Sequence, residues 1–154
     1  MIKENEMTDA LNKEIGGSHY KRFKYQPIEF IMKYKLNFIE GNIFKYLCRY
    51  KFKDGVKDLE KAMHYCELWD KFTGYRDPTS DASVYDILVF ISKNGLCEQD
   101  GSNGSASEIG CLLTKFWAAI RRDNPFDSYS MRDFVEYLNT VIKYNKGEID
   151  GYNM

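Results

Sequence analysis

Residues 41–62 read GNIFKYLCRYKFKDGVKDLEKA, and this stretch decides how the N-terminal half of the chain folds. Its apolar residues recur at the three- and four-residue spacing of an amphipathic helix. Asp54-Gly55 interrupts the pattern, which then resumes. Because a connection this short joins helices that run antiparallel, we expect a helical hairpin.

A polar stripe runs along the first helix of this hairpin, beside its apolar face. At about 100° per residue, four residues fall within a band of about 80°: Asn42, Lys45, Arg49 and Lys53. Like charges four residues apart on a helix repel each other, and an anion bound between them would remove that cost. The planar guanidinium of an arginine also matches phosphate oxygens. We therefore expect the stripe to bind a phosphate-bearing ligand, and the alternative is a charged face that only meets water.

Two neighbouring residues, Asn42 and Tyr46, have two interpretations each. Gly41 and Asn42 lie near the start of the helix, where backbone N–H groups and the helix dipole favour an anion. Asn42 is equally well explained as a cap or as an ordinary polar residue. Tyr46 falls mostly on the core side of the helix, and stacking on a nucleotide base is the alternative for its ring.

The second helix of the hairpin carries further candidates. Asp58 and Lys61 lie on the side that faces the stripe. For Asp58 we favour a salt bridge to Arg49 or Lys53 over a role in holding Mg²⁺ or orienting an attacking hydroxyl. Before the hairpin, His19 is a candidate for donating to phosphate or for proton transfer, against simple packing at a helix start.

The rest of the chain also follows the helical period, which predicts a mainly α fold. We expect helices at about 26–34, 37–52, 56–72, 82–94, 105–122 and 130–146. Pro27 suits the first turn of the first helix. Ser130 with Asp133 resembles a capping box, and Gly147 is a plausible C-terminal stop. Residues 84–91 are the one place where a strand could replace a helix.

The predicted organisation has three parts. Residues 1–17 are polar and are expected to be a mobile lead-in, residues 18–72 form the hairpin domain, and residues 83–154 form a second helical domain. Between the two domains, residues 73–82 contain Gly, Pro and small polar residues, which is typical of a linker.

The charge is unevenly distributed along the chain. Residues 19–61 carry 11 Lys and Arg against 5 Asp and Glu, whereas residues 78–154 carry 7 against 11. The partner of the first half is therefore expected to be anionic. The overall pI of about 6.1 argues against a dedicated nucleic-acid binder, so we rank a small nucleotide ahead.

The cysteines, the hydropathy and the absence of two motifs indicate the expected cellular compartment and exclude some classes of protein. Four separated cysteines form no C-x-x-C pair and are expected to be buried thiols, as in a reducing cytoplasm. No apolar run approaches the roughly 20 residues of a membrane span, so we expect a soluble protein that is not exported. Neither the P-loop motif nor G-x-G-x-x-G is present, which excludes the ordinary P-loop kinase and Rossmann readings.

The ordered motifs of residues 18–70 support a family resemblance. They comprise His19-Tyr20, Pro27-Ile28-Glu29, Gly41-Asn42-x-x-Lys45-Tyr46-x-x-Arg49-Tyr50-x-x-Lys53-Asp54-Gly55 and Asp58-Leu59-x-Lys61-Ala62-x-x-Tyr65. This set resembles the domain-of-unknown-function 3310 family of small bacteriophage proteins. The resemblance implies a phage protein and a family that includes nucleotide kinases without a P-loop, which act on deoxynucleoside monophosphates in the host cytoplasm. It does not extend to residues 78–154.

These observations lead to a first hypothesis of a nucleotide kinase-like phage enzyme. His19 and Asp58 would then be catalytic, with Asp58 also the ligand of Mg²⁺. The nucleotide would be held by six residues: Asn42, Lys45, Tyr46, Arg49, Lys53 and Lys61.

Two alternatives stay open at this stage. One is sequestration of a nucleotide or nucleotide-derived defence signal without chemistry, and the other is antagonism of a host protein through the second half of the chain. Pyrophosphohydrolase chemistry ranks last, because it needs clustered carboxylates that the sequence lacks. A single basic cluster leaves a ligand half exposed, so we also expect a homo-oligomer.

Overall fold

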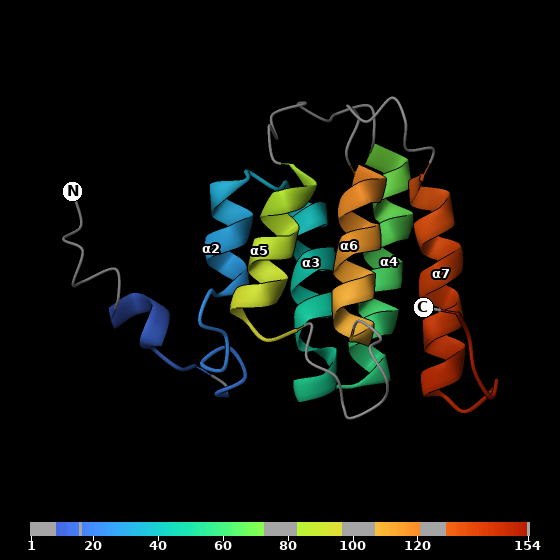
Figure 1. The fold of residues 1–154 in the computed structure, drawn as a ribbon, viewed down its shortest axis with the longest axis horizontal. Coiled ribbons are helices and arrows are strands. Elements are labelled where there is room, and N and C mark those ends of the chain that lie inside the picture. The colour runs from blue at the N-terminus through green and yellow to red at the C-terminus, as the bar shows by residue number, and fades with distance from the viewer. Residues whose placement is uncertain (1–8, 16, 73–82, 97–106, 121–128, 154) are drawn as a thin grey trace.

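The computed structural model describes residues 9–15, 17–72, 83–96, 107–120 and 129–153. Within these ranges the chain forms helices and no strand, so the predicted mainly α class is confirmed. After a helical turn at residues 9–12, the elements are α2 (Pro27–Lys33), α3 (Phe38–Arg49), the 3-10 helix η1 (Tyr50–Phe52), α4 (Val56–Phe72), α5 (Val84–Lys93), α6 (Glu108–Ile120) and α7 (Met131–Asn145). Figure 1 shows α2 to α7 side by side as a bundle with roughly aligned axes.

The predicted hairpin is present and is built by local geometry. α3 and α4 pack closely along their lengths, joined by η1 and a tight turn. Gly55 lies in the left-handed region, with φ of 57°, and its N–H donates to the carbonyl of Tyr50 at 2.8 Å. A residue with a Cβ is strained in that region, so glycine at this position makes the reversal possible.

Side-chain caps fix where helices begin. Asn37 precedes α3 and its side chain accepts a hydrogen bond from the backbone N–H of Glu40 at 2.9 Å. The predicted capping box of Ser130 and Asp133 is confirmed at the start of α7. At the other end of α7, Gly147 adopts φ of 73°, as expected for a C-terminal stop.

The segment that the sequence left open between helix and strand is helical. Residues 84–91 lie within α5, whose start carries a capping box from Ser83 and Asp86. Ile87, Phe90 and Ile91 are buried at three- and four-residue spacing, so one face of a helix covers the core. A strand would have placed Phe90 and Ile91 on opposite faces.

One hydrophobic core connects the two predicted halves. α3 lies at its centre and packs against α2, α4 and α6, while α4 also packs against α7. In the middle of the core, the rings of Phe30 and Phe44 stack with their centroids 4.8 Å apart. Phe90 and Trp117, from the second half, contact the same Phe30 ring edge-on. The hairpin is therefore stabilised by the second half as well as by its own contacts.

A buried carboxylate also connects the halves. Glu108, in the first turn of α6, accepts hydrogen bonds from the phenols of Tyr50 and Tyr152 and from the side-chain amide of Asn145. Burial and the neighbouring carboxylate raise the pKa of both tyrosines, which stay neutral donors. Through this residue the end of α3, the start of α6 and the C-terminal tail meet at one point.

The cysteine prediction is confirmed in part. Cys48 and Cys66 are buried thiols with no disulfide, and burial raises the pKa of Cys66 to about 12. Cys111 is only partly buried, and Cys97 lies outside the described residues. Most of the expected lead-in (1–17) and all of the expected linker (73–82) also lie outside the described residues. No helix among the described residues is long and apolar enough to span a bilayer.

Candidate functional site

The centre of the predicted stripe is a buried ion pair. The guanidinium of Arg49 donates from Nε and Nη2 to the two carboxylate oxygens of Asp58, at 2.9 and 3.1 Å. Asp58 is fully buried and Arg49 is 9% exposed. Burial alone would lower the pKa of Arg49, but hydrogen bonds to Asp58 and Tyr20 raise it. The sequence favoured a salt bridge from Asp58 to Arg49 or Lys53, and the structure pairs Asp58 with Arg49.

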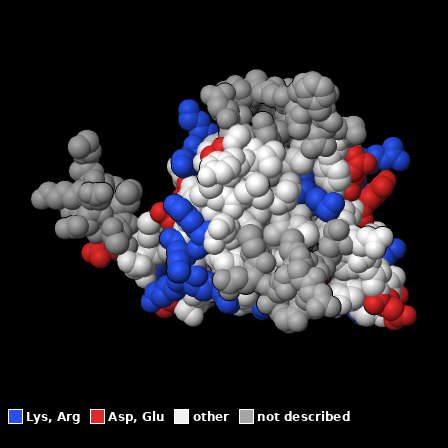
Figure 2. All heavy atoms as spheres, viewed as in Figure 1, with Lys and Arg blue, Asp and Glu red and all other residues white. Residues whose placement is uncertain are grey.

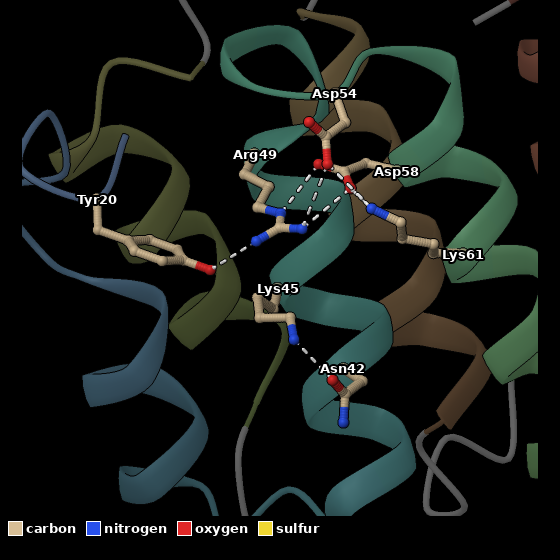
Figure 3. A network of polar contacts seen from close by, with 7 residues as sticks. All are labelled: Tyr20, Asn42, Lys45, Arg49, Asp54, Asp58 and Lys61. Atoms are coloured by element: carbon tan, nitrogen blue, oxygen red, sulfur yellow. Dashed lines mark hydrogen bonds and ion pairs between the residues drawn. The ribbon is translucent and has the colours of Figure 1, made fainter. Parts of the chain in front are cut away.

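Two exposed groups surround this pair at the end of the hairpin. Lys61 donates to Asp58 and to Asp54, at 3.0 Å in both cases. Asp54 also lies 3.9 Å from the guanidinium of Arg49. The hydrogen bond from Lys61 lowers the pKa of Asp54. Figure 3 shows these four side chains converging between α3 and α4.

Three cations gather around the ring of Tyr46, which is partly buried. Lys45 Nζ lies 4.4 Å from the ring centroid, Arg49 Cζ 4.8 Å and Lys61 Nζ 5.5 Å. The ring of Tyr46 also stacks with that of Tyr65 of α4, with the centroids 5.9 Å apart and the planes inclined by 29°. Since the ring face attracts cations, Tyr46 gathers the positive charges of both helices in one place.

Lys45 differs from the other cations in its partners. Its ammonium donates to the side-chain oxygen of Asn42 at 2.7 Å, and within the described ranges it makes no ion pair. Burial lowers the pKa of Lys45, and the positive charge of Arg49 lowers it further. Asn42 in turn donates to the carbonyl of Phe38 at 2.7 Å. Lys45 therefore lies close to other positive charges, and no carboxylate is hydrogen-bonded to it.

One expectation about the helix start needs correction. α3 begins at Phe38, so Gly41 and Asn42 lie a full turn inside it. The N–H of Gly41 donates to the carbonyl of Asn37 at 2.8 Å and is not available to an anion. The cap is Asn37, and the sequence signal for it was present as an Asn three residues before Glu40.

The structure divides the predicted site residues into two groups. The first group is joined by hydrogen bonds, ion pairs and cation–π contacts on the α3–α4 hairpin: Asn42, Lys45, Tyr46, Arg49, Asp58 and Lys61. The second group, His19 and Lys53, lines a pocket at the end of η1. Lys53 therefore does not continue the stripe as its spacing predicted, because the chain leaves the α-helix at Tyr50.

Tyr20 is the residue that connects the two groups. Its hydroxyl accepts a hydrogen bond from Nη1 of Arg49 at 3.4 Å, and its ring lies 4.2 Å from that of His19. Burial raises the pKa of Tyr20. Sequence reasoning gave it no role, because its contact with Arg49 spans 29 residues and no spacing rule reports such a contact.

The geometry around Asp58 does not fit a magnesium ligand. Both of its carboxylate oxygens already accept hydrogen bonds from Arg49 and Lys61, and the side chain is fully buried. Mg²⁺ requires near-octahedral oxygen ligands and keeps several waters. Within the described residues there is also no group of three or more His, Cys, Asp or Glu side chains placed to hold a metal ion.

Comparison with known proteins identifies a relationship for part of the chain. Residues 15–67 match the model of a family described as a protein of unknown function, DUF3310. This segment resembles that family. The match covers α2, α3, η1 and most of α4, and so includes every predicted site residue. No curated protein and no solved structure matches the chain.

Proposed function

We propose that the α3–α4 hairpin binds the phosphate of a nucleotide or nucleotide-derived small molecule, at the cations around Tyr46. The observation that carries the proposal is Lys45. Its ammonium is partly buried and hydrogen-bonded to a neutral amide. Burial and the charge of Arg49 lower its pKa, and Lys61 and Lys53 act in the same direction, against the opposing effect of Asp58. An anion within about 4 Å would gain between about 1 and 4 kcal/mol from each such charge, depending on exposure.

The local charge balance supports an anionic ligand. Three cations lie around the ring of Tyr46, while the ion pairs of Arg49 and Lys61 involve two carboxylates, Asp54 and Asp58, so one positive charge is left in excess. A phosphate monoester carries about −1.5 to −2 at neutral pH, which would offset the excess. Arg49 is buried and already paired with Asp58, so in this proposal Lys45 and Lys61 make the direct contacts.

Binding is better supported than chemistry. Asp58 is fully buried against Arg49, and is therefore a poor general base as well as a poor metal ligand. The function that fits the geometry best is retention of a phosphate-bearing nucleotide, in the cytoplasm of a phage-infected host as the family resemblance implies. The further prediction is phosphoryl transfer to a nucleoside monophosphate, with Mg²⁺ brought by the nucleotide. A turnover assay tests it.

The test compares wild-type protein with Lys45→Gln and with a control, Lys71→Gln, at the exposed far end of α4. Equilibrium dialysis with labelled mono- and triphosphates measures affinity. We expect Lys45→Gln to weaken binding at least about tenfold, equivalent to about 1.4 kcal/mol, and Lys71→Gln to leave it unchanged. Equal binding by all three proteins would exclude the proposal.

A second arm measures turnover. Wild-type protein is incubated with labelled triphosphate, monophosphates and Mg²⁺, and the products are separated. New phosphorylated products would assign transferase activity, whereas retained but unchanged nucleotide assigns sequestration. Charge reversal at Arg49 is a poor probe for either, because it would leave the carboxylate of Asp58 buried and unpaired.

A further inference from the structure

A pocket of about 460 Å³ lies beside the α3–α4 hairpin and is not part of the cation cluster around Tyr46. It is formed by the segment before α2 and by the end of η1. Its lining residues are Gly17, Ser18, His19, Arg22, Phe52 and Lys53. Figure 2 shows Lys and Arg side chains gathered over the segment that precedes α2, at the lower left of the face drawn.

One of the lining residues, His19, has a buried polar atom with no partner. Nε2 of His19 is buried and makes no hydrogen bond to any of the residues described. The other nitrogen, Nδ1, lies against Gly17, where an added Cβ would come within 3.2 Å of it. Gly17 also has φ of 132°, so a larger residue is disfavoured there on two counts. The ring is thus held by a close backbone approach, while Nε2 remains unsatisfied.

The charges that face His19 are mainly positive. Burial lowers its pKa, and Lys53 and Arg49 lower it further, while the more weakly acting Asp58 and Asp54 raise it. Arg22 is stacked on the ring of Phe52, with Cζ 3.3 Å from the centroid, which holds another cation at the pocket. Near neutral pH the imidazole is therefore neutral, in a cavity whose walls favour an anion.

We infer that this pocket is a second phosphate site, in which His19 takes up a proton as a dianionic phosphate group enters beside Arg22 and Lys53. The inference rests on the proposed function in one respect only, that the natural ligand carries phosphate. The proton comes from solvent and converts imidazole to imidazolium, and no bond to phosphorus forms or breaks. Nε2 of the imidazolium then carries an N–H that donates a hydrogen bond, and a phosphate oxygen accepts it.

The proton uptake has a defined sign. The pKa of His19 lies below its ordinary value in the free protein and rises when an anion neutralises the field of Lys53 and Arg49. Affinity for a dianion therefore increases as pH falls from the pKa of the complex toward the pKa of the free protein. Sulfate is the suitable probe, because it stays dianionic across this range whereas a phosphate monoester itself titrates near pH 6.

The experiment is an NMR titration of the two imidazoles of the full chain, from about pH 5 to about pH 8, with and without sulfate. His64, exposed on α4 and paired with Glu67, is the internal reference. We expect sulfate to raise the pKa of His19. We also expect sulfate affinity to increase at least about tenfold between the two ends of the pH range, the change expected from a full pKa unit of difference.

Two variants and two further probes complete the test. Lys53→Gln is expected to raise the pKa of His19 in the free protein and to weaken sulfate binding, and His19→Gln is expected to abolish the pH dependence. Inorganic phosphate that reproduces the sulfate effect assigns the pocket to free phosphate, whereas an effect stronger with nucleotide assigns it to the nucleotide's terminal phosphate. A pKa of His19 that does not respond to any of the three anions overturns the inference.

The outcome is separable from that of the proposed function. Lys45→Gln is expected to weaken nucleotide binding while leaving the sulfate response of His19 in place. If nucleotide fails to bind but His19 responds to sulfate, the proposed function fails and the pocket remains an anion site. If nucleotide binding depends on Lys45 but His19 never responds, the second site is wrong and the first one stands.

Discussion

Removing the charge of Asp58 tests the central feature of the hairpin. In Asp58→Asn the guanidinium of Arg49, whose side chain is 11% exposed, loses the carboxylate that accepts two of its hydrogen bonds. Breaking a buried ion pair from one side costs about 3–5 kcal/mol, because the remaining charge stays desolvated and unpaired. Asp54, 3.9 Å away, and the hydroxyl of Tyr20 offer partial compensation. We therefore expect a loss near the lower end, about 3 kcal/mol.

Urea unfolding followed by circular dichroism measures this loss. With a slope of about 2 kcal/mol per molar, the transition midpoint of Asp58→Asn falls by about 1.5 M. Glu67→Gln is the matched control on the same helix, since Glu67 is 70% exposed and its loss changes stability by less than about 0.5 kcal/mol.

A double variant distinguishes the cost of leaving one charge unpaired from the cost of removing both charges. Replacing both partners, as Arg49→Met with Asp58→Leu, leaves no unpaired charge, and such swaps are often neutral or stabilising. We expect the double variant to be more stable than Asp58→Asn alone. A loss below about 1 kcal/mol in Asp58→Asn, or an equal loss in the double variant, would refute the reasoning.

Two further predictions concern packing between helices. Burial alone would raise the pKa of Asp86, but hydrogen bonds from Tyr34 and Ser83 lower it; Tyr34→Phe should therefore raise that pKa in a carboxyl-carbon NMR titration. The hydrogen bond from Tyr34 stabilises the ionised carboxylate of Asp86. Its contribution to the free energy of unfolding is therefore present above the ordinary aspartate pKa and is lost as the pH falls through the lowered pKa of Asp86. The stabilities of Tyr34→Phe and wild type should then become equal in acid. In Gly110→Ala the new Cβ would lie 3.0 Å from the carbonyl oxygen of Leu96. That crowding costs about 1–3 kcal/mol and outweighs the roughly 0.5–1 kcal/mol gained in helix propensity, whereas Gly151→Ala, with nothing within 4 Å, should leave the melting temperature unchanged.

The sequence alone determined the positions of the helices, because the signals are local. The spacing of apolar residues predicted α3 and α4, Gly55 predicted the turn between them, and Ser130 with Asp133 predicted the start of α7. Each of these depends on residues within a few positions along the chain, where backbone geometry is fixed by i, i+3 and i+4 relations.

Tertiary structure decided what the charged residues do. The sequence left Arg49 and Lys53 as alternative partners of Asp58. The register of α4 against α3 put Asp58 beside Arg49 and left Lys45 without a carboxylate partner. The fold of residues 17–22 against η1 brought His19 to Lys53. These pairings depend on the burial of charged groups and on contacts between residues that are far apart in the sequence. Local spacing rules do not predict such contacts.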